Sequence, residues 1–285
     1  MGGYLNPGSD LFEMALRSQI FVDKSGLIEK TNRCVRTLQR YICVSRPRRF
    51  GKSMGVDMLA AYYDRSVDTK NLFQELKINS TEEYEKHLNQ YDVLKINMQE
   101  FLSATENIDQ MLRMLNDYLL FDLKEQYGQV RFRDENSLVQ VMKDVYSYTK
   151  HPFVILIDEW DCLFREYQQD QEAQKKYLDF LRAWLKDKDY VALAYMTGIL
   201  PIKKYGTHSA LNMFDEFSML DPGPLAQYTG FTEAEVRKLC EKYRMDLDEV
   251  KGWYDGYSFE QEPSVYSPRS VVSCMRFGKL ENYWN

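Results

Sequence analysis

The sequence predicts an α/β fold in which a parallel sheet of about five strands is flanked by helices and followed by a small helical C-terminal lobe. Short apolar runs alternate with longer amphipathic segments, which is the pattern of strands joined by helical crossovers. One apolar run leads through a Gly-Lys-Ser loop directly into an amphipathic helix. Another is apolar throughout and is closed by two acidic residues, as expected for a strand buried on both faces.

The composition is that of a globular protein with one large or two modest domains. Of the 285 residues, 44% are hydrophobic and 14% are aromatic, which is ample material for a packed core. The net charge of −6 argues against bulk electrostatic binding to nucleic acid or anionic membranes. The five cysteines contain no Cys-x-x-Cys pair and indicate neither a disulfide framework nor a zinc site. The sequence has neither a signal-peptide pattern nor a run of about 18 apolar residues, so we expect a cytoplasmic protein without a membrane partner.

The first half of the chain supplies two predicted strands. Residues 40–45 form a short β-prone run, and helical apolar spacing then extends over residues 52–63. A second strand is predicted over residues 91–98, followed by helical stretches around residues 106–127 and 135–149. Strands separated by helices in this way pair in parallel.

Three more strands are predicted further along. The run over residues 152–157 is expected at the middle of the sheet because it is continuously apolar. A helix at about 171–187 carries an apolar stripe, which we attribute to core packing. The fourth strand covers residues 190–196 and stops at Thr197-Gly198, and the fifth covers residues 214–220.

The pattern changes after the fifth strand. Asp221-Pro-Gly-Pro224 breaks the chain, and Thr232-Glu-Ala-Glu235 is a capping box that opens another helix. We therefore predict a domain boundary near residue 222. The sheet-containing domain would cover residues 1–222, and a small, mostly helical lobe would cover residues 223–285.

The Gly-Lys-Ser loop matches the phosphate-binding pattern G-x-x-x-x-G-K-[ST] except at its first position, where Arg46 replaces glycine. In such a loop backbone N–H groups cradle phosphate, the lysine neutralises its charge, and the hydroxyl ligates magnesium. Gly51, Lys52 and Ser53 supply these parts, and the dipole of the following helix also favours an anion. The chain is therefore predicted to be a P-loop NTPase. The residues expected to contact the nucleotide are Arg46, Pro47, Arg48, Arg49, Phe50, Gly51, Lys52, Ser53 and Met54.

The arginines of this loop allow two interpretations. Arg46, Arg48 and Arg49 either form a solvated basic loop or include residues that contact phosphate and sense its charge. A related hypothesis gives these arginines a role in binding nucleic acid, in which case affinity would fall with salt.

The acidic residues at the end of the third strand complete the predicted site. Ligands of open α/β sheets bind outside the carboxyl ends of strands. We expect Asp158 to hold Mg²⁺, directly or through water, and Glu159 to orient or deprotonate the attacking water. The alternative is that both acids merely end a strand in solvent. Thr197, which ends the next strand, is either a sensor of the γ-phosphate or an ordinary strand-end residue.

A strand between the loop strand and the acidic strand, together with a glutamate beside the aspartate, points to the additional-strand ATPases. Water is then the expected phosphoryl acceptor.

Asp161 and Arg165, one helical turn apart, are interpreted as a surface ion pair or as a trans-acting pair in an oligomer. Trp160 is interpreted as a core residue rather than an adenine platform. The isolated histidines are interpreted as structural: His87, His151 and His208.

The motifs resemble those of the bacterial AAA-ATPase-like family, P-loop ATPases related to the AAA and STAND groups that often continue into a PD-(D/E)XK nuclease-like domain. The matching stretches are residues 4–8, 21–24, 45–53, 157–161, 195–202, 230–232, 253–257 and 266–268.

The resemblance implies that Arg46 belongs to the family's own version of the loop. It also implies that Phe21-Val-Asp-Lys24 lies near the adenine and that the C-terminal lobe acts as a lid. Members of the family generally run well beyond the Asn-Tyr-Trp at residues 282–284, whereas this chain ends at Asn285. No nuclease function is expected of these residues.

The sequence thus predicts an ATP-binding protein that hydrolyses ATP with Mg²⁺ and whose cycle moves the lid and controls a protein partner or self-association. One alternative is a nucleotide-binding switch or interaction module without useful hydrolysis. Another is a nucleic-acid-associated regulator that uses the arginine loop.

Overall fold

The computed structural model describes residues 3–202, 210–258 and 264–283. The main sheet is built from five strands: β1 (Tyr41–Ser45), β2 (Asp92–Asn97), β3 (Phe153–Asp158), β4 (Val191–Gly198) and β5 (Asp215–Phe217). Their order is β2-β3-β4-β1-β5, and every neighbouring pair is parallel. The predicted α/β class with a five-stranded parallel sheet is therefore confirmed.

The order of the strands differs from the predicted one in one respect. We expected β3 at the middle of the sheet, but that position belongs to β4, which is buried along its whole length. Both strands are apolar and paired on both sides, so hydrophobicity alone could not rank them. In space β4 separates β1 from β3, whereas β2, which separates them in the sequence, lies at the sheet's edge.

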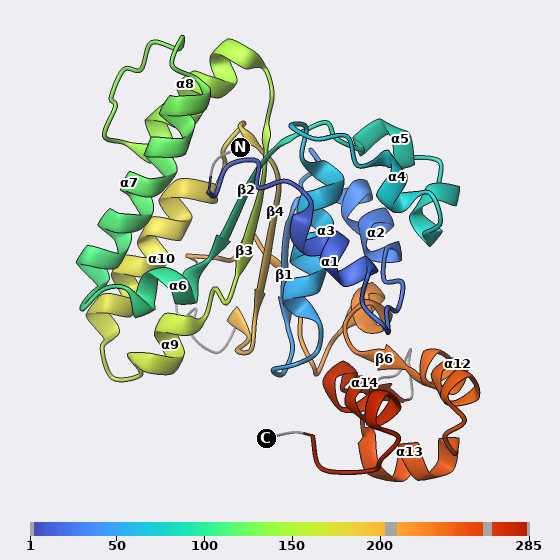
Figure 1. The fold of residues 1–285 in the computed structure, drawn as a ribbon. Coiled ribbons are helices and arrows are strands. Elements are labelled where there is room, and N and C mark those ends of the chain that lie inside the picture. Colours follow the sequence, from blue (N-terminus) through green and yellow to red (C-terminus); the bar gives the residue numbers. More distant parts are fainter. Residues whose placement is uncertain (1–2, 203–209, 259–263, 284–285) are drawn as a thin grey trace.

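Helices cover both faces of this sheet (Figure 1). One side carries α6 (Met98–Ser103), α7 (Ile108–Gln126), α8 (Leu138–Thr149), α9 (Cys162–Glu166) and α10 (Gln171–Leu185). The other carries α1 (Asp10–Leu16), α2 (Gly26–Cys34), α3 (Lys52–Tyr63) and the short elements α4 (Lys70–Phe73), η1 (Lys77–Ser80) and α5 (Tyr84–His87). Each side has its own hydrophobic core against the sheet. Within the described ranges, no helix combines the length and apolar character needed to cross a membrane.

The stretch Tyr4–Gly8 lies along the free edge of β2. Leu5 forms an antiparallel bridge with Leu94, and the Asn6 backbone N–H donates to the Val93 carbonyl over 2.7 Å. The Asn6 side-chain carbonyl accepts a hydrogen bond of 2.8 Å from the Val93 N–H. These contacts give the motif a structural role in covering the sheet edge.

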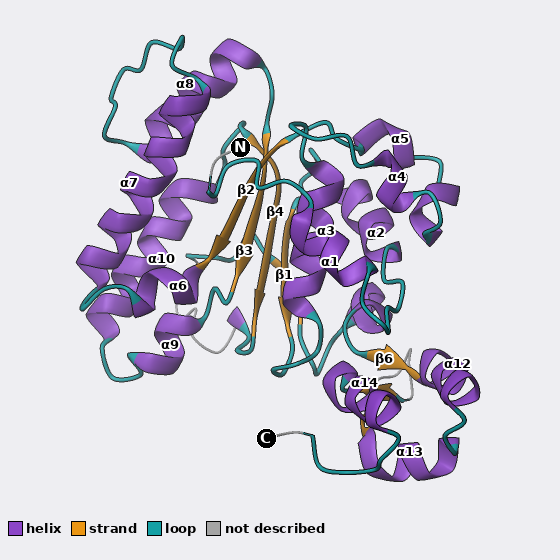
Figure 2. Ribbon diagram, in the orientation of Figure 1, coloured by secondary structure: helices purple, strands orange, loops and turns teal. Residues whose placement is uncertain are grey.

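The chain after the main sheet forms a smaller C-terminal lobe (Figure 2), whose residues between Phe231 and Met275 share a third hydrophobic cluster. Its elements are β6 (Phe231–Thr232), α12 (Glu233–Tyr243), α13 (Leu247–Tyr254), β7 (Asp255–Tyr257), β8 (Val265–Tyr266) and α14 (Pro268–Phe277). The preceding element, η2 (Gly223–Tyr228), places Leu225 in the core on the α2 and α3 side of the main sheet. The predicted capping box of α12 is present, since Thr232 and Glu235 each accept the other's backbone N–H. The three strands pair as a small antiparallel sheet, which the sequence did not predict. The boundary near residue 222 stays a prediction.

Candidate functional site

The loop between β1 and α3 turns through two residues with left-handed backbone conformations. Arg49 has a φ of 70°, and Gly51, which precedes α3, has a φ of 80°. A Cβ added at Gly51 would meet no atom within 4 Å. The backbone conformation, rather than lack of space, is therefore what favours glycine here.

Lys52 is buried inside the turn of this loop. Its Nζ donates to the carbonyl oxygens of Arg46 and Pro47 over 3.1 and 2.9 Å. Burial lowers the pKa of Lys52, while the negative charges of Glu159 and Asp158 oppose that shift. The ammonium group is thus within electrostatic reach of both strand-end acids.

Asp158, at the end of β3, joins three parts of the chain. One carboxylate oxygen accepts a hydrogen bond from the Ser53 hydroxyl, and the other accepts one from the Thr197 hydroxyl. The latter oxygen also accepts the Glu159 N–H over 3.0 Å. Asp158 and Thr197 are both buried, so the bond between them is shielded from water, whereas Ser53 is exposed. The loop, the acidic strand and the next strand therefore meet at a single carboxylate.

Glu159 follows with a φ of 54°, a conformation that non-glycine residues rarely adopt. Its carboxylate forms an ion pair with Arg165 on α9. Burial raises the pKa of Glu159, and the guanidinium of Arg165 opposes that shift. The acid does not simply end a strand in solvent, because its side chain is largely covered and paired.

Asp161 is also paired with Arg165, at 3.5 Å between carboxylate and Nε. The Asp161 side chain is fully buried and that of Arg165 is 16% exposed, so the expected surface ion pair is wrong. The same Asp161 oxygen accepts the backbone N–H groups of Ile199 and Leu200 over 3.0 and 2.8 Å. Trp160 is completely buried in the core beneath the sheet, as predicted.

The arginines of the loop have different environments. Arg46 is fully buried, and its Nη1 donates to the carbonyls of Ser45 and Phe217 over 2.9 and 2.8 Å. Burial lowers the pKa of Arg46 to about 10. Its side chain is not part of a solvated loop, and contact with phosphate would require these bonds to break. Arg48 and Arg49 are exposed, and Arg49 donates to the Tyr283 carbonyl over 3.1 Å.

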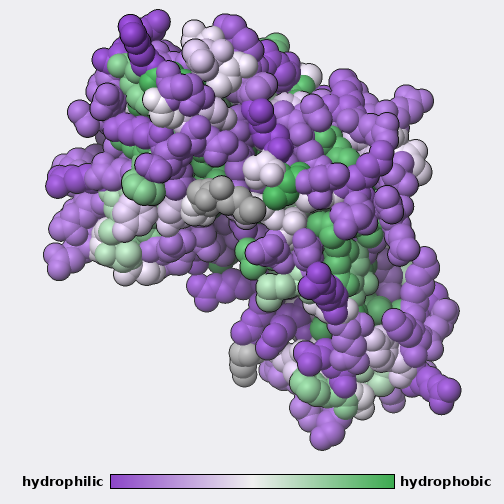
Figure 3. Space-filling view, turned by 45° about the horizontal axis from the view of Figure 1, so that its top comes forward, coloured by the Kyte–Doolittle hydropathy of each residue, from purple (hydrophilic) through white to green (hydrophobic). Residues whose placement is uncertain are grey.

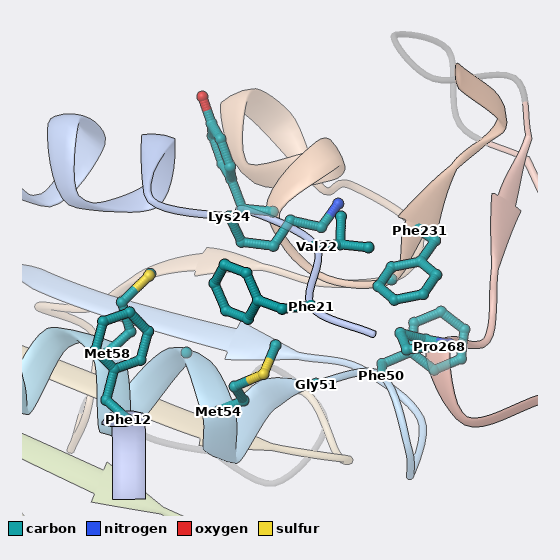
Figure 4. Close-up of a pocket in the computed structure, with 13 residues that line it drawn as sticks. Phe12, Phe21, Val22, Lys24, Phe50, Gly51, Met54, Met58, Phe231 and Pro268 are labelled. Atoms are coloured by element: carbon teal, nitrogen blue, oxygen red, sulfur yellow. The ribbon is translucent and has the colours of Figure 1, made fainter. Parts of the chain in front are cut away.

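A mainly apolar pocket lies beside the start of α3 (Figure 4). Phe21 and Val22 lie between Met54 on α3 and Phe231 in the C-terminal lobe (Figure 4). Lys24 also lines the pocket, but its Nζ donates to the Gln227 carbonyl over 2.7 Å and pairs with Glu235 at 2.5 Å. Figure 3 shows hydrophobic residues gathered next to the lobe on a face that is otherwise largely hydrophilic.

Phe50 connects the loop directly to the C-terminal lobe. It is 1% exposed, and its ring packs edge-on against Tyr257 at a centroid distance of 5.0 Å. Its carbonyl accepts the Gly230 N–H over 3.0 Å. Sequence reasoning missed this contact, although Gly230 and Tyr257 both lie in stretches that the resemblance had singled out. The glycine at position 230 could have indicated this contact in the sequence. It has a φ of 85°, and a Cβ at this position would collide with Phe50 and Val265.

A strand, a Gly-Lys-Ser loop and a helix that meet a buried strand-end aspartate, with a further strand inserted between, define a P-loop protein of the additional-strand type. A family model described as "Predicted AAA-ATPase" matches residues 9–207, and the chain belongs to this family of P-loop ATPases. The resemblance drawn from the motifs is confirmed.

Two further comparisons describe what the chain is similar to. It is 25% identical over 279 residues to a protein of Azotobacter chroococcum mcd 1 described as "Uncharacterized protein in vnfD 5'region". The match covers 93% of this chain and 50% of that protein, so the chain spans about half the length of its curated relative. A solved structure of the Aeropyrum pernix ORC2 protein in ADPNP–ADP complexes superposes with a TM-score of 0.39 and 9% identity, covering 83% of this chain and 55% of the other.

Proposed function

We propose that this chain binds ATP together with Mg²⁺ and hydrolyses it to ADP and phosphate. The observation that carries the proposal is the convergence of Ser53 and Thr197 on the Asp158 carboxylate, beside the buried ammonium group of Lys52. A hydroxyl, a carboxylate and an amine at the start of a helix are the groups that phosphoryl transfer uses for positioning and charge stabilisation.

The donor set at this point fits magnesium. Ser53 and Asp158 offer oxygen ligands, which Mg²⁺ prefers. Ser53 lies in the first turn of α3, and Asp158 at the end of β3 is hydrogen-bonded to it. No group of three His, Cys, Asp or Glu side chains suited to a metal occurs among residues 3–202, 210–258 and 264–283. Ser53 and Asp158 are the proposed protein ligands, and the nucleotide phosphates would complete the coordination. The ion would neutralise charge on the transferred phosphoryl group.

The remaining residues have distinct proposed roles. Lys52 would exchange the carbonyl oxygens of Arg46 and Pro47 for phosphate oxygens, which are stronger partners because they are charged. Glu159 would orient the attacking water and accept its proton, and Thr197 would sense the γ-phosphate through Asp158.

The apolar pocket is the proposed adenine site. Phe21, Val22, Met54 and Phe231 offer flat or flexible apolar surface, and Gly51 of the phosphate loop lines the same pocket. The C-terminal lobe contributes Phe231 and closes one side of the pocket, which supports the role of a lid over the nucleotide.

Nucleotide-dependent thermal stability tests the proposal. At ATP·Mg²⁺ concentrations of about 100 times the Kd, binding would stabilise the fold by roughly 2.7 kcal/mol, and Lys52→Ala would abolish the shift. Lys70→Ala is the matched control, because Lys70 is exposed and paired with Glu85 on the surface. An unchanged melting temperature with ATP and GTP, with or without Mg²⁺, would reject nucleotide binding. A shift without release of phosphate would leave the nucleotide-binding switch as the function.

A further inference from the structure

Arg165 contacts three polar groups from two parts of the site. Its guanidinium forms the ion pair with Glu159, lies 3.5 Å from Asp161, and donates to the Gln99 side-chain oxygen over 3.4 Å. The Arg165 side chain is only 16% exposed, so these contacts replace most of its solvation. A guanidinium held by several partners has a defined position, because its donors form a rigid planar fork.

Asp161 and Gln99, two of the three groups that contact Arg165, are themselves held in place by other hydrogen bonds. Asp161 is fully buried and accepts the two backbone N–H groups that follow β4, so its carboxylate has little freedom to rotate. Gln99 is held through its amide nitrogen, which donates to Glu166 over 2.6 Å. Arg165 is therefore held by Gln99 of α6 and by Asp161, which is in turn bonded to the loop after β4.

Glu159 depends on this arrangement for its orientation. Its backbone has a φ of 54°, and throughout the described part of the chain its carboxylate has one ion-pair partner, Arg165. A glutamate side chain has three rotatable bonds, so without that partner its carboxylate would sample several rotamers.

We propose that Arg165 is a positioning residue for ATP hydrolysis, which holds the Glu159 carboxylate in the single orientation that presents it to the attacking water. The inference rests on the proposed hydrolysis by this site. Arg165 acts through Glu159 and does not contact the nucleotide. A misplaced base costs on the order of a hundredfold in rate, while ATP binding by the loop is unaffected.

The test is a double-mutant cycle on steady-state phosphate release from ATP·Mg²⁺. Arg165→Ala is expected to lower kcat by about tenfold to a hundredfold while KM for ATP stays within about twofold. Arg165→Lys, which keeps the charge but lacks the fork, is expected to recover part of the loss. In a Glu159→Gln background, Arg165→Ala is expected to lower kcat by less than about twofold further, because the base is already removed.

Arg133→Ala is the matched control, since it removes a 77% exposed arginine that pairs with the buried Asp144. It should leave kcat unchanged. Full activity in Arg165→Ala would overturn the inference, and higher activity would identify the ion pair as a brake on Glu159. Multiplicative losses in the double variant would show that Arg165 acts independently of Glu159.

The failure of the proposed function has a different signature. If the unmodified protein is stabilised by ATP·Mg²⁺ but releases no phosphate, hydrolysis is rejected, and the role of Arg165 is rejected with it. If the unmodified protein is active and only the Arg165 variants behave otherwise than expected, the proposed function stands and this inference alone fails.

Discussion

Replacing Gly230 by alanine should destabilise the protein far more than the same change at another glycine of the C-terminal lobe. Gly230 has a φ of 85°, which costs an L-residue roughly 1–2 kcal/mol. The new Cβ would also lie 2.5 Å from a Val265 methyl carbon and 3.1 Å from the Phe50 ring. Such overpacking costs about 1–3 kcal/mol. Together these effects predict a loss of about 2–5 kcal/mol in the free energy of unfolding.

Urea unfolding followed by tryptophan fluorescence measures this loss. Gly256→Ala is the matched control, because a Cβ at Gly256 meets nothing within 4 Å and its φ is not in the left-handed region. The control should change the free energy of unfolding by less than about 0.5 kcal/mol. Equal effects for the two variants, or a loss below about 1 kcal/mol for Gly230→Ala, would refute the packing of Gly230 against Phe50.

Three further predictions follow from the described contacts. Glu159→Gln should still bind ATP in a thermal-shift assay while phosphate release falls by on the order of 10² to 10⁴, and equal turnover would remove Glu159 from the mechanism. Arg46→Ala should lower the free energy of unfolding by about 2–4 kcal/mol, because two carbonyls lose a buried donor, whereas the exposed Arg48→Ala should change it by less than about 0.5 kcal/mol. Burial lowers the pKa of His87 below 6.5, so the unfolded chain binds the proton more readily and stability should fall as the pH drops below that value. His87→Gln should flatten this dependence in urea titrations, and an identical pH profile would show that the fall arises elsewhere.

The central parts of the fold could be predicted because local patterns determine them. Helix α3 begins and ends where the apolar spacing predicted, at residues 52 and 63. The meeting of Ser53 with Asp158 follows from topology, because parallel strands bring their carboxyl ends to one edge. Chemistry-bearing residues that follow strands directly are therefore placed well by sequence alone.

Other features depend on contacts between distant segments. The buried position of Arg46 requires β5, whose Phe217 carbonyl lies 171 residues away in the chain. The contact of Phe50 with the C-terminal lobe likewise depends on how the lobe docks. The small sheet of β6, β7 and β8 has strands of two or three residues, which are too short to show an alternating pattern.

The buried ring of Phe50 couples the conformation of the phosphate loop to the position of the C-terminal lobe. A lobe that moves must carry Phe50 with it or expose a fully buried aromatic ring, and either event disturbs the neighbouring Gly51 and Lys52. Thermodynamic linkage between two binding events is reciprocal. If a bound nucleotide changes the affinity of the lobe for another molecule by some factor, that molecule changes the affinity for nucleotide by the same factor. A protein that docks on the lobe would thereby change the affinity for nucleotide without approaching the phosphates.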